Sequence, residues 1–282
     1  MSRVRIRNLW HQYGDRVVLE RLNLDVEPRS FVAVAGPSGC GKSTLLRLIL
    51  GQERPSRGRI EVDGRPLVPE PGPERGVVFQ RYSVMPHLTV VENVILGLEF
   101  ARSRLGRLFG RARRTAMAEA EHALEQVGLI GVRDRYPHTL SGGMQQRLSI
   151  AQALIRRPRL LLLDEPFGAL DPGTKDAIHR LVIHLWHASA VTIVMVTHDL
   201  REAFALGSRV LVLDRVRSDP QAPERYGAAV TYDLPLRRSA SEVEEGRRPP
   251  EPDALEVSGL EPAREVVRRR GLPGGEVRAA SR

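Results

Sequence analysis

One stretch of the chain has the residue types and spacing of a phosphate-binding loop. Residues 36–43 read G-P-S-G-C-G-K-S and match the pattern G-x-x-x-x-G-K-[ST] at every fixed position. Glycines let successive backbone N–H groups converge on an anion, and the positive end of the following helix strengthens the attraction. The residues that we expect to bind a nucleotide are Gly36, Pro37, Ser38, Gly39, Cys40, Gly41, Lys42, Ser43 and Thr44.

Two side chains of this stretch predict particular chemistry. Lys42 is one of only two lysines among 43 basic residues, which suggests that a compact ammonium is needed at the β- and γ-phosphates. The Ser43 hydroxyl is the expected ligand of Mg²⁺. The single cysteine, Cys40, excludes an intramolecular disulfide and suits a reducing compartment. Its place before a helix predicts a lowered thiol pKa, and so a maleimide reaction that ATP blocks.

The elements that position the loop are an apolar strand, residues 30–35, and an apolar helix, residues 43–50. Other polar residues follow similar buried-type runs: Gln80 follows 76–79, Asp164 and Glu165 follow 160–163, and His198 follows 191–197. Ligands of open α/β sheets bind outside the carboxyl ends of the strands, so we expect these side chains near the phosphates. Asp164 suits Mg²⁺, Glu165 can polarise the attacking water, and His198 can bind the γ-phosphate or orient water.

A second anion site is predicted at residues 140–147, L-S-G-G-M-Q-Q-R, which open the helix 148–155. Ser141, Gly142 and Gly143 offer a hydroxyl and bare N–H groups at a helix N-terminus. A chain with two phosphate sites should bring them together, either in itself or in a dimer.

The rest of the chain divides into β-rich, helical and polar segments. Residues 4–9 alternate as an edge strand would, and residues 22–26 and 59–64 also predict strands. Tyr13, in the turn after the first strand, could stack on a base, although such a tyrosine is more often a packing residue. Helical spacing dominates residues 86–137, interrupted by a basic loop, 101–114, that could contact headgroups or a partner or simply be solvated. Three histidines on one helix, His179, His184 and His187, favour a solvated face over a metal site.

Composition bounds the class of protein. The 282 residues suit one large or two small domains, and the formal charge of +9 suits an anionic surface or merely reflects solvated arginines. No apolar run approaches the roughly 20 residues that span a bilayer, and we expect a soluble, cytoplasmic chain. Residues 237–282 predict a disordered tail. A short strand is predicted before this tail, at residues 228–232.

Together these motifs resemble the ATP-binding subunits of ATP-binding-cassette (ABC) transporters, over residues 3–216. In the order of that family the sequence has an aromatic at Tyr13, the phosphate loop, Gln80, the signature motif 140–147, Asp164 with Glu165, the A-L-D loop 169–171 and His198. The signature motif discriminates best, because many nucleotide hydrolases have a phosphate loop and few have this second element.

The resemblance implies an α/β fold: a P-loop NTPase core, with a mostly parallel sheet flanked by helices, an antiparallel β subdomain and an α-helical signature subdomain. The ATP-binding domain would comprise residues 1–236, with the helical subdomain at 86–158. The resemblance also implies that Tyr13 stacks on adenine and that Ser43, Gln80 and Asp164 bind Mg²⁺. Catalysis would depend on Glu165 as general base, with His198, Lys42 and Gln80 assisting.

The partners follow from the same resemblance. Two copies would dimerise head to tail, so that Ser141, Gly142 and Gly143 of one chain close over ATP on Lys42 of the other. The helical subdomain would dock on transmembrane permease subunits at the inner face of the cell membrane. A periplasmic or lipid-anchored solute-binding protein would be an indirect partner, and no nucleic acid is expected.

The segments F-Q-R-Y-S-V-M-P-H-L-T-V-V-E-N-V and E-P-F-G-A-L-D are similar to importers of the nitrate, sulfonate and taurine group. Residues 215–236 suggest, more weakly, urea- or guanidine-related members. His87 stands where that group has tryptophan, a departure from its pattern. The alternative is a soluble ABC-type ATPase that acts in cofactor assembly or on nucleic acid.

Overall fold

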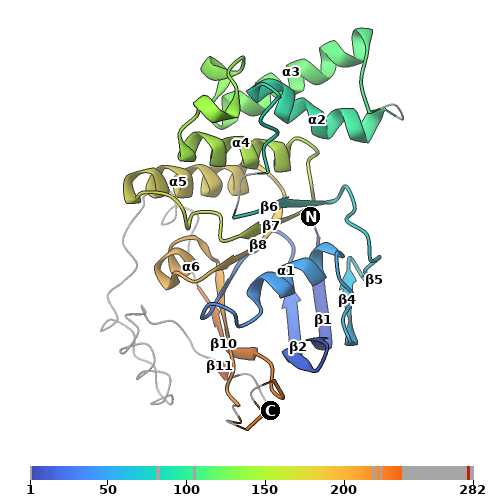
Figure 1. Cartoon of the computed structure of the whole chain (residues 1–282), viewed down its shortest axis with the longest axis vertical. Coiled ribbons are helices and arrows are strands. Elements are labelled where there is room, and N and C mark those ends of the chain that lie inside the picture. Colours follow the sequence, from blue (N-terminus) through green and yellow to red (C-terminus); the bar gives the residue numbers. More distant parts are fainter. Residues whose placement is uncertain are drawn as a thin grey trace. The chain divides into compact units, whose positions relative to one another are not determined.

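The computed structural model describes residues 2–80, 83–103, 106–217, 219, 221–222, 224–236 and the backbone of 278–279. The chain forms two compact units, of which the first comprises Met1–Pro71 with Trp186–Arg282 and the second comprises Gly72–Leu185. Figure 1 shows the order of their elements along the chain. The phosphate loop and His198 belong to the first unit, whereas Gln80, the signature motif and Asp164 belong to the second.

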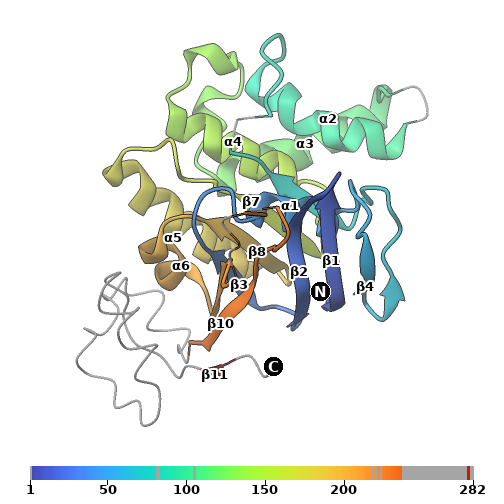
Figure 2. The same cartoon turned by 60° about the horizontal axis from the view of Figure 1, so that its bottom comes forward.

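The first unit contains a four-stranded antiparallel sheet in the order β2–β1–β4–β5. Its strands are β1 (Val4–Tyr13), β2 (Arg16–Val26), β4 (Arg57–Val62) and β5 (Arg65–Pro66), and Figure 2 shows β1 beside β2. The prediction of an edge strand at residues 4–9 was wrong, because β1 lies between β2 and β4. Val4, Ile6 and Leu9 are fully buried, so the alternation correctly indicates one buried face but contains no information about the strand's neighbours.

A second set of strands in the first unit contains both parallel and antiparallel pairs. Its members are β3 (Phe31–Ala35), β8 (Thr192–Thr197), β9 (Arg209–Asp214), β10 (Ala229–Pro235) and β11 (Arg278–Ala279), in the order β11–β10–β9–β3–β8. The pairing is antiparallel on both sides of β10. Strand β3 pairs in parallel with β8 and β9, and every residue of β3 and β8 is buried, as their continuous apolar runs require. Helix α1 (Lys42–Leu50) packs against β8, and α6 (Leu200–Leu206) packs against β3 and β8. These contacts confirm the predicted α/β core.

The second unit combines a parallel strand pair with helices. Its elements are β6 (Arg75–Val78), β7 (Leu160–Asp164), α2 (Val90–Arg102), α3 (Gly110–Gln126), α4 (Gly142–Leu154), most of α5 (Pro172–Ala188) and the 3-10 turns η1 (Ile130–Val132) and η2 (Pro137–Thr139). Helices α2, α3 and α4 pack against one another (Figure 1). The predicted helical region is therefore confirmed, while the subdomain boundaries 86–158 stay a prediction.

The start of α2 is fixed by two polar side chains. Thr89 and Glu92 form a capping box, in which each side chain accepts from the other residue's backbone N–H. Asn93 is 1% exposed, and its amide nitrogen donates to the carbonyl oxygens of Met85 and Leu88, both at 3.0 Å. The Met85 N–H donates back to Asn93 Oδ1 at 2.7 Å. Asn93 thereby anchors the segment that enters α2.

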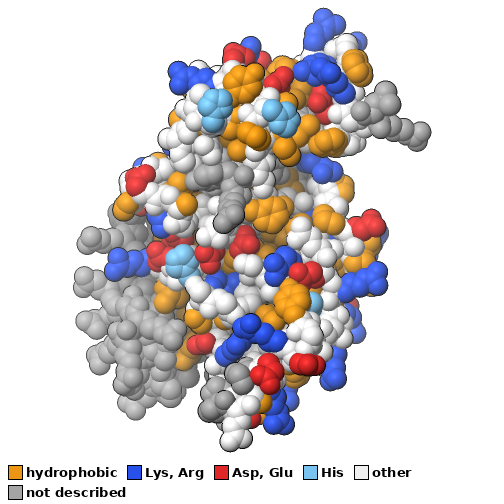
Figure 3. All heavy atoms as spheres, viewed as in Figure 1, with side chains coloured by type: hydrophobic (Ala, Val, Ile, Leu, Met, Phe, Trp, Pro, Cys, Tyr) orange, Lys and Arg blue, Asp and Glu red, His pale blue; other side chains and the backbone are white. Residues whose placement is uncertain are grey.

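The predicted basic loop, residues 101–114, was too long: residues 101–102 end α2 and residues 110–114 begin α3, so the connection between the helices is residues 103–109. Alanine and arginine are good helix formers, so a basic composition alone does not exclude a helix. Leu108 is buried, whereas Phe100 and Phe109 are 67% and 64% exposed. Arg113 pairs with Glu99 at 3.0 Å, so not every arginine of residues 101–114 is solvated. Figure 3 shows hydrophobic and basic side chains together at the surface of the helical part. The question of headgroup, partner or solvent contact stays open, and Leu105 lies outside the described residues.

Two further predictions concern the end of the chain and the membrane. The strand predicted at 228–232 is confirmed as β10. The tail, residues 237–282, lies outside the described residues except for the backbone of β11. In the part of the chain that the structure describes, no helix has the length and apolar character needed to cross a membrane.

Candidate functional site

The phosphate loop connects the buried strand β3 to helix α1. Pro37, Ser38 and Gly39 are exposed between these elements. Gly39 and Gly41 have φ values of +76° and +106°, which residues with a Cβ rarely adopt. Gly41 is the N-cap of α1, with no side chain to cap it, so the first N–H groups of the helix lack a side-chain acceptor at that position. This geometry suits an anion at the helix N-terminus.

Close neighbours, a backbone carbonyl in one case and two side chains in the other, explain two of the glycines. A Cβ on Gly36 would lie 2.2 Å from the carbonyl oxygen of Leu213, at the end of β9. A Cβ on Gly41 would lie 2.8 Å from Leu19 Cδ2 and 2.9 Å from Val18 Cγ1, both on β2. The loop therefore packs between two strands, and only glycine fits at its first and sixth positions without rearrangement.

Lys42 is folded over the loop that precedes it. Its side chain is 4% exposed, and Nζ donates to the carbonyl oxygens of Gly36 at 2.9 Å and Pro37 at 3.0 Å. A buried ammonium requires such acceptors. These two carbonyl oxygens belong to the loop whose N–H groups would bind an anion. Phosphate oxygens bound there could therefore replace the carbonyl oxygens as acceptors of the Lys42 ammonium.

Cys40 differs from the prediction. The thiol is 3% exposed, and its pKa is raised mainly by burial, with the negative charge of Asp214 adding to the effect. Lys42 acts in the opposite direction but does not reverse the shift. The predicted lowered pKa was wrong, because burial outweighs the positive end of the helix.

The strand register places His198 next to the phosphate loop. Ala35, the last residue of β3, is paired with Thr197, the last residue of β8. Gly36 and His198 follow these two residues, so both emerge at the same end of adjacent parallel strands. His198 is exposed, and Thr197 Oγ1 accepts from the Asp199 N–H at 3.0 Å. The expectation that His198 emerges beside the loop is met within the first unit.

Tyr13 ends β1 and is 44% exposed. Its hydroxyl donates to Glu53 Oε2 at 2.6 Å, so the side chain is anchored at its tip rather than buried in the core. Sequence reasoning missed Glu53 and its neighbours, because Glu53 is separated from Tyr13 by 40 residues and matches no motif.

In the second unit, the strand register places two of the three predicted Mg²⁺ ligands, Gln80 and Asp164, at the same end of a strand pair, whereas Ser43 belongs to the first unit. Val78 of β6 is paired with Leu163 of β7. Asp164 follows Leu163 directly, and Gln80 lies two residues beyond Val78, so both are at the same end of the strand pair. Glu165 has φ +44°, a left-handed conformation that a glutamate rarely adopts and that is common at functional sites.

The signature motif begins helix α4. Ser141 is exposed and is the N-cap, with Oγ accepting from the Met144 N–H at 3.3 Å. Gly142 is also exposed, but Gly143 is buried, and a Cβ there would lie 2.3 Å from Thr174 Cγ2. Packing against α5 thus gives Gly143 a structural reason to be glycine, separate from its predicted role toward ATP.

The A-L-D loop and the three histidines lie around α5. Asp171 Oδ1 accepts from the Thr174 N–H at 3.0 Å at the start of the helix. The hydrogen bond with the Thr174 side chain, and next the one from the Thr174 N–H, lower the pKa of Asp171. His184 and His187 are exposed as predicted, but His179 contacts Phe167 edge-on, with ring centroids 4.6 Å apart. No group of three or more His, Cys, Asp or Glu side chains that could hold a metal ion occurs among the described residues.

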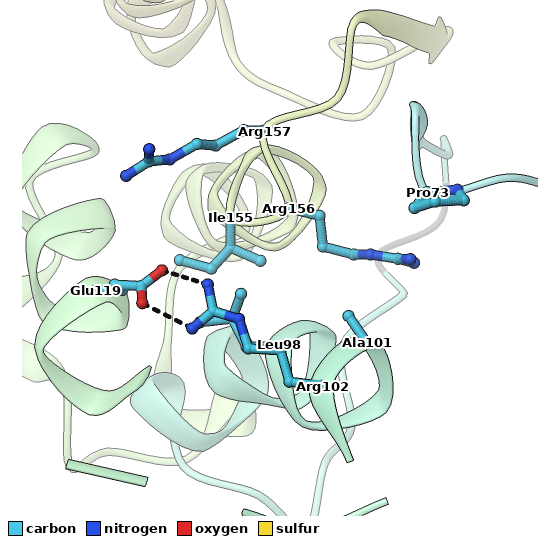
Figure 4. A pocket seen from close by; sticks show the side chains of 8 residues that line it. All are labelled: Pro73, Leu98, Ala101, Arg102, Glu119, Ile155, Arg156 and Arg157. Carbon is cyan, nitrogen blue, oxygen red and sulfur yellow. Dashed lines mark hydrogen bonds and ion pairs between the residues drawn. The ribbon is translucent and has the colours of Figure 1, made fainter. Parts of the chain in front are cut away.

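A pocket of about 360 Å³ lies in the second unit. It is lined by Pro73, Leu98, Ala101, Arg102, Glu119, Ile155, Arg156 and Arg157. Figure 4 shows the bidentate pair between Arg102 and Glu119, at 2.7 and 2.8 Å, forming part of its wall. Of the described residues that line this pocket, none is predicted to bind ATP or Mg²⁺.

A glycine loop between a buried parallel strand and a helix, with a buried lysine at the helix start, defines an α/β nucleotide-binding fold with a phosphate loop. Comparisons with known proteins give the family. A family model described as ABC transporter matches residues 19–168, and the chain belongs to this family. The ATP-binding subunits of this family hydrolyse ATP. The predicted resemblance to ABC transporter subunits and the predicted ATP hydrolase activity are thereby confirmed.

Individual relatives and solved structures agree. The chain is 46% identical over 200 residues to the nitrate import ATP-binding protein NrtD of Synechocystis sp., covering 71% of this chain and 72% of that protein. It is 41% identical over 237 residues to the taurine import ATP-binding protein TauB of Rhizobium johnstonii, covering 84% of each. The dimeric structure of MJ0796, a bacterial ABC transporter cassette, matches with a TM-score of 0.68 and 30% identity, covering 84% of this chain and 100% of that chain.

Proposed function

We propose that this chain binds Mg²⁺-ATP and hydrolyses it to power import of a small anionic or zwitterionic solute through a separate permease. The single observation that supports this best is the 46% identity to a nitrate import ATP-binding protein. The 41% identity to a taurine import ATP-binding protein agrees with it. The alternative of a soluble ABC-type ATPase without a transport role is not favoured by these relatives.

The phosphate loop supplies the nucleotide site of this proposal. The backbone N–H groups of Ser38, Gly39 and the start of α1 would bind the phosphates, and Lys42 would exchange the carbonyl oxygens of Gly36 and Pro37 for phosphate oxygens. Gly36 packs against the carbonyl oxygen of Leu213, so the loop has no room for a side chain at this position.

The donor set fits Mg²⁺, since a hydroxyl, a carboxylate and an amide oxygen are hard ligands. Ser43, Asp164 and Gln80 would hold the ion, which when bound neutralises charge on the β- and γ-phosphates. Glu165 would accept the proton of the attacking water, and His198 would assist by holding that water or the γ-phosphate. Register supports the pairing of Asp164 with Gln80 in one unit and of the loop with His198 in the other.

The proposal includes a dimer with composite sites. Ser141 and Gly142 are exposed at the start of α4, as residues that close over a second chain's ATP must be. Gly143 would contribute its backbone N–H from a buried position. The dimeric form of the MJ0796 cassette supports a homodimer. We place the chain in the cytoplasm, on permease subunits at the inner face of the membrane, with a solute-binding protein as indirect partner.

The experiment is reconstitution of the chain with the permease encoded beside it, in proteoliposomes that contain ATP. Nitrate or taurine with the matching solute-binding protein should stimulate phosphate release, and Lys42→Ala should abolish the stimulation. Phosphate release that no permease changes, or tight nucleic-acid binding by the purified chain at physiological salt, would reject the transport role.

A further inference from the structure

Tyr13 is held by two side chains from beyond the phosphate loop. Its hydroxyl donates to Glu53 Oε2 at 2.6 Å and accepts from Arg47 Nη2 at 3.1 Å. Arg47 is on the last turn of α1, and Glu53 follows that helix, whereas Tyr13 is at the end of β1. The hydroxyl is therefore fixed on both sides by charged groups, and such hydrogen bonds are stronger than neutral ones.

The carboxylate of Glu53 is the centre of this cluster. Arg47 Nε lies 2.9 Å from Oε1, and His11 Nε2 lies 3.2 Å from Oε2. His11 also packs edge-on against the Tyr13 ring, with centroids 4.8 Å apart and an interplanar angle of 85°. With its side chain 25% exposed, Glu53 is shielded enough for these contacts to be held. The hydroxyl of Tyr13 is therefore held by hydrogen bonds, and its ring is held by the contact with His11.

The same arginine reaches the nucleotide site. Arg47 Nη2 donates to Thr44 Oγ1 at 3.2 Å, and Thr44 is 5% exposed directly after the loop residues Lys42 and Ser43. One guanidinium thus links the hydroxyl of Tyr13 to the helix that starts at the phosphate loop. This link therefore connects the position of the aromatic ring directly to the helix that follows the phosphate loop.

We propose that Glu53 and Arg47 are positioning residues for ATP, which fix the Tyr13 ring at the separation from the phosphate loop that a nucleotide spans. The inference rests on the proposed function, because it takes the exposed ring face as the platform for adenine. An unanchored exposed tyrosine would lose rotamer freedom on binding, whereas the cluster removes that freedom beforehand. The cluster acts on the base and not on the phosphates.

The test measures binding of two ligands to the full chain by isothermal titration calorimetry. ATP contacts both the ring and the loop, whereas inorganic triphosphate can contact only the loop. Tyr13→Phe keeps the aromatic face and removes the hydroxyl, and Glu53→Ala removes the acceptor. Each should weaken ATP binding about three- to tenfold, the scale of one ordinary hydrogen bond, and leave triphosphate binding unchanged.

A double variant and two controls sharpen the result. Tyr13→Phe combined with Glu53→Ala should bind ATP no more weakly than the weaker single variant, because both remove one link. Glu53→Gln, which keeps an acceptor, should recover part of the loss. Glu61→Ala removes a similar ion pair, Arg59–Glu61 at 2.9 Å, and should bind both ligands normally.

Three results would overturn the inference. Unchanged ATP affinity in Tyr13→Phe would exclude a role for the hydroxyl, and this variant serves even if Glu53→Ala does not fold. An equal loss for ATP and triphosphate in both variants would show a general structural effect. ATP binding to Lys42→Ala as tight as to the wild type would instead reject the proposed phosphate site, and the two failures are thereby distinguished.

Discussion

Lys42 Nζ donates to the carbonyl oxygen of Gly36 at 2.9 Å, so the ammonium is held over its own phosphate loop. The side chain is 4% exposed, and a charge at that depth is stable only with acceptors close by. Phosphate oxygens are stronger acceptors for an ammonium than carbonyl oxygens, since they are charged. A bound phosphate would therefore replace the carbonyl oxygens of Gly36 and Pro37 as acceptors of the Lys42 ammonium.

Replacing Lys42 by alanine should remove this exchange. We expect ATP hydrolysis to fall by about 100-fold or more, the scale on which groups that stabilise developing charge contribute. Phosphate release by the purified chain measures it. Lys175→Ala, the chain's other lysine, is the matched control and should hydrolyse ATP normally. Equal rates in the two variants would contradict the assignment of the loop.

Gly36 and Gly39 are glycines for different reasons, which predicts different costs. In Gly36→Ala the new Cβ would meet the Leu213 carbonyl oxygen at 2.2 Å, so the backbone must shift, at a cost of about 1–3 kcal/mol. In Gly39→Ala nothing lies within 4 Å, and only the positive φ is unfavourable, at roughly 1 kcal/mol. Thermal unfolding should show the larger loss for Gly36→Ala; the reverse order would contradict the packing described.

The buried thiol of Cys40 should react slowly with maleimide near neutral pH, and faster in urea. Burial raises its pKa, so the folded state binds the thiol proton more tightly than the unfolded state does. The stability that results is present below the unfolded thiol pKa of about 8.5 and is lost as the pH rises through the folded pKa. The advantage of wild type over Cys40→Ala in unfolding should therefore shrink at alkaline pH. An advantage that grows would contradict the raised pKa.

Much of the first unit could be predicted from the sequence, because its signals are local. Continuous apolar runs in β3 and β8 reflect burial on both faces, and the glycine spacing of the loop identifies the turn between strand and helix. The signature motif is equally local, since Ser141 caps the helix that its own sequence begins.

The remainder depends on contacts that no local pattern contains. The central position of β1 is set by pairing with β2 and β4, and alternation is the same in an edge strand. The pKa of Cys40 depends on how deeply the loop is packed, and the Glu53–Tyr13 contact joins residues from separate elements. Likewise, the half-buried His179 contacts Phe167, which precedes α5 and belongs to no element that the helical pattern of α5 can indicate.

Ser141 allows the capping role to be separated from the proposed closing role. Ser141→Ala loses the acceptor for the Met144 N–H and should cost about 1 kcal/mol of stability. Ser141→Asp retains a good N-cap but places a negative charge where a second chain's triphosphate would lie. We expect near-normal thermal unfolding and no ATP-dependent dimer in Ser141→Asp. Dimer formation by that variant, seen by light scattering, would exclude Ser141 from the composite site.

Glu165 is central to the proposed mechanism: it would act as general base in the hydrolysis of ATP that Lys42 binds, within a dimer that ATP holds together. Glu165→Gln, measured by size-exclusion chromatography with light scattering, tests it most directly, because the variant should bind ATP without turning it over. We expect this variant to form a stable dimer with Mg²⁺-ATP, to be a monomer without nucleotide, and to release phosphate about 100-fold more slowly than the wild type. A Glu165→Gln chain that stays monomeric with ATP, or releases phosphate at the wild-type rate, would contradict it.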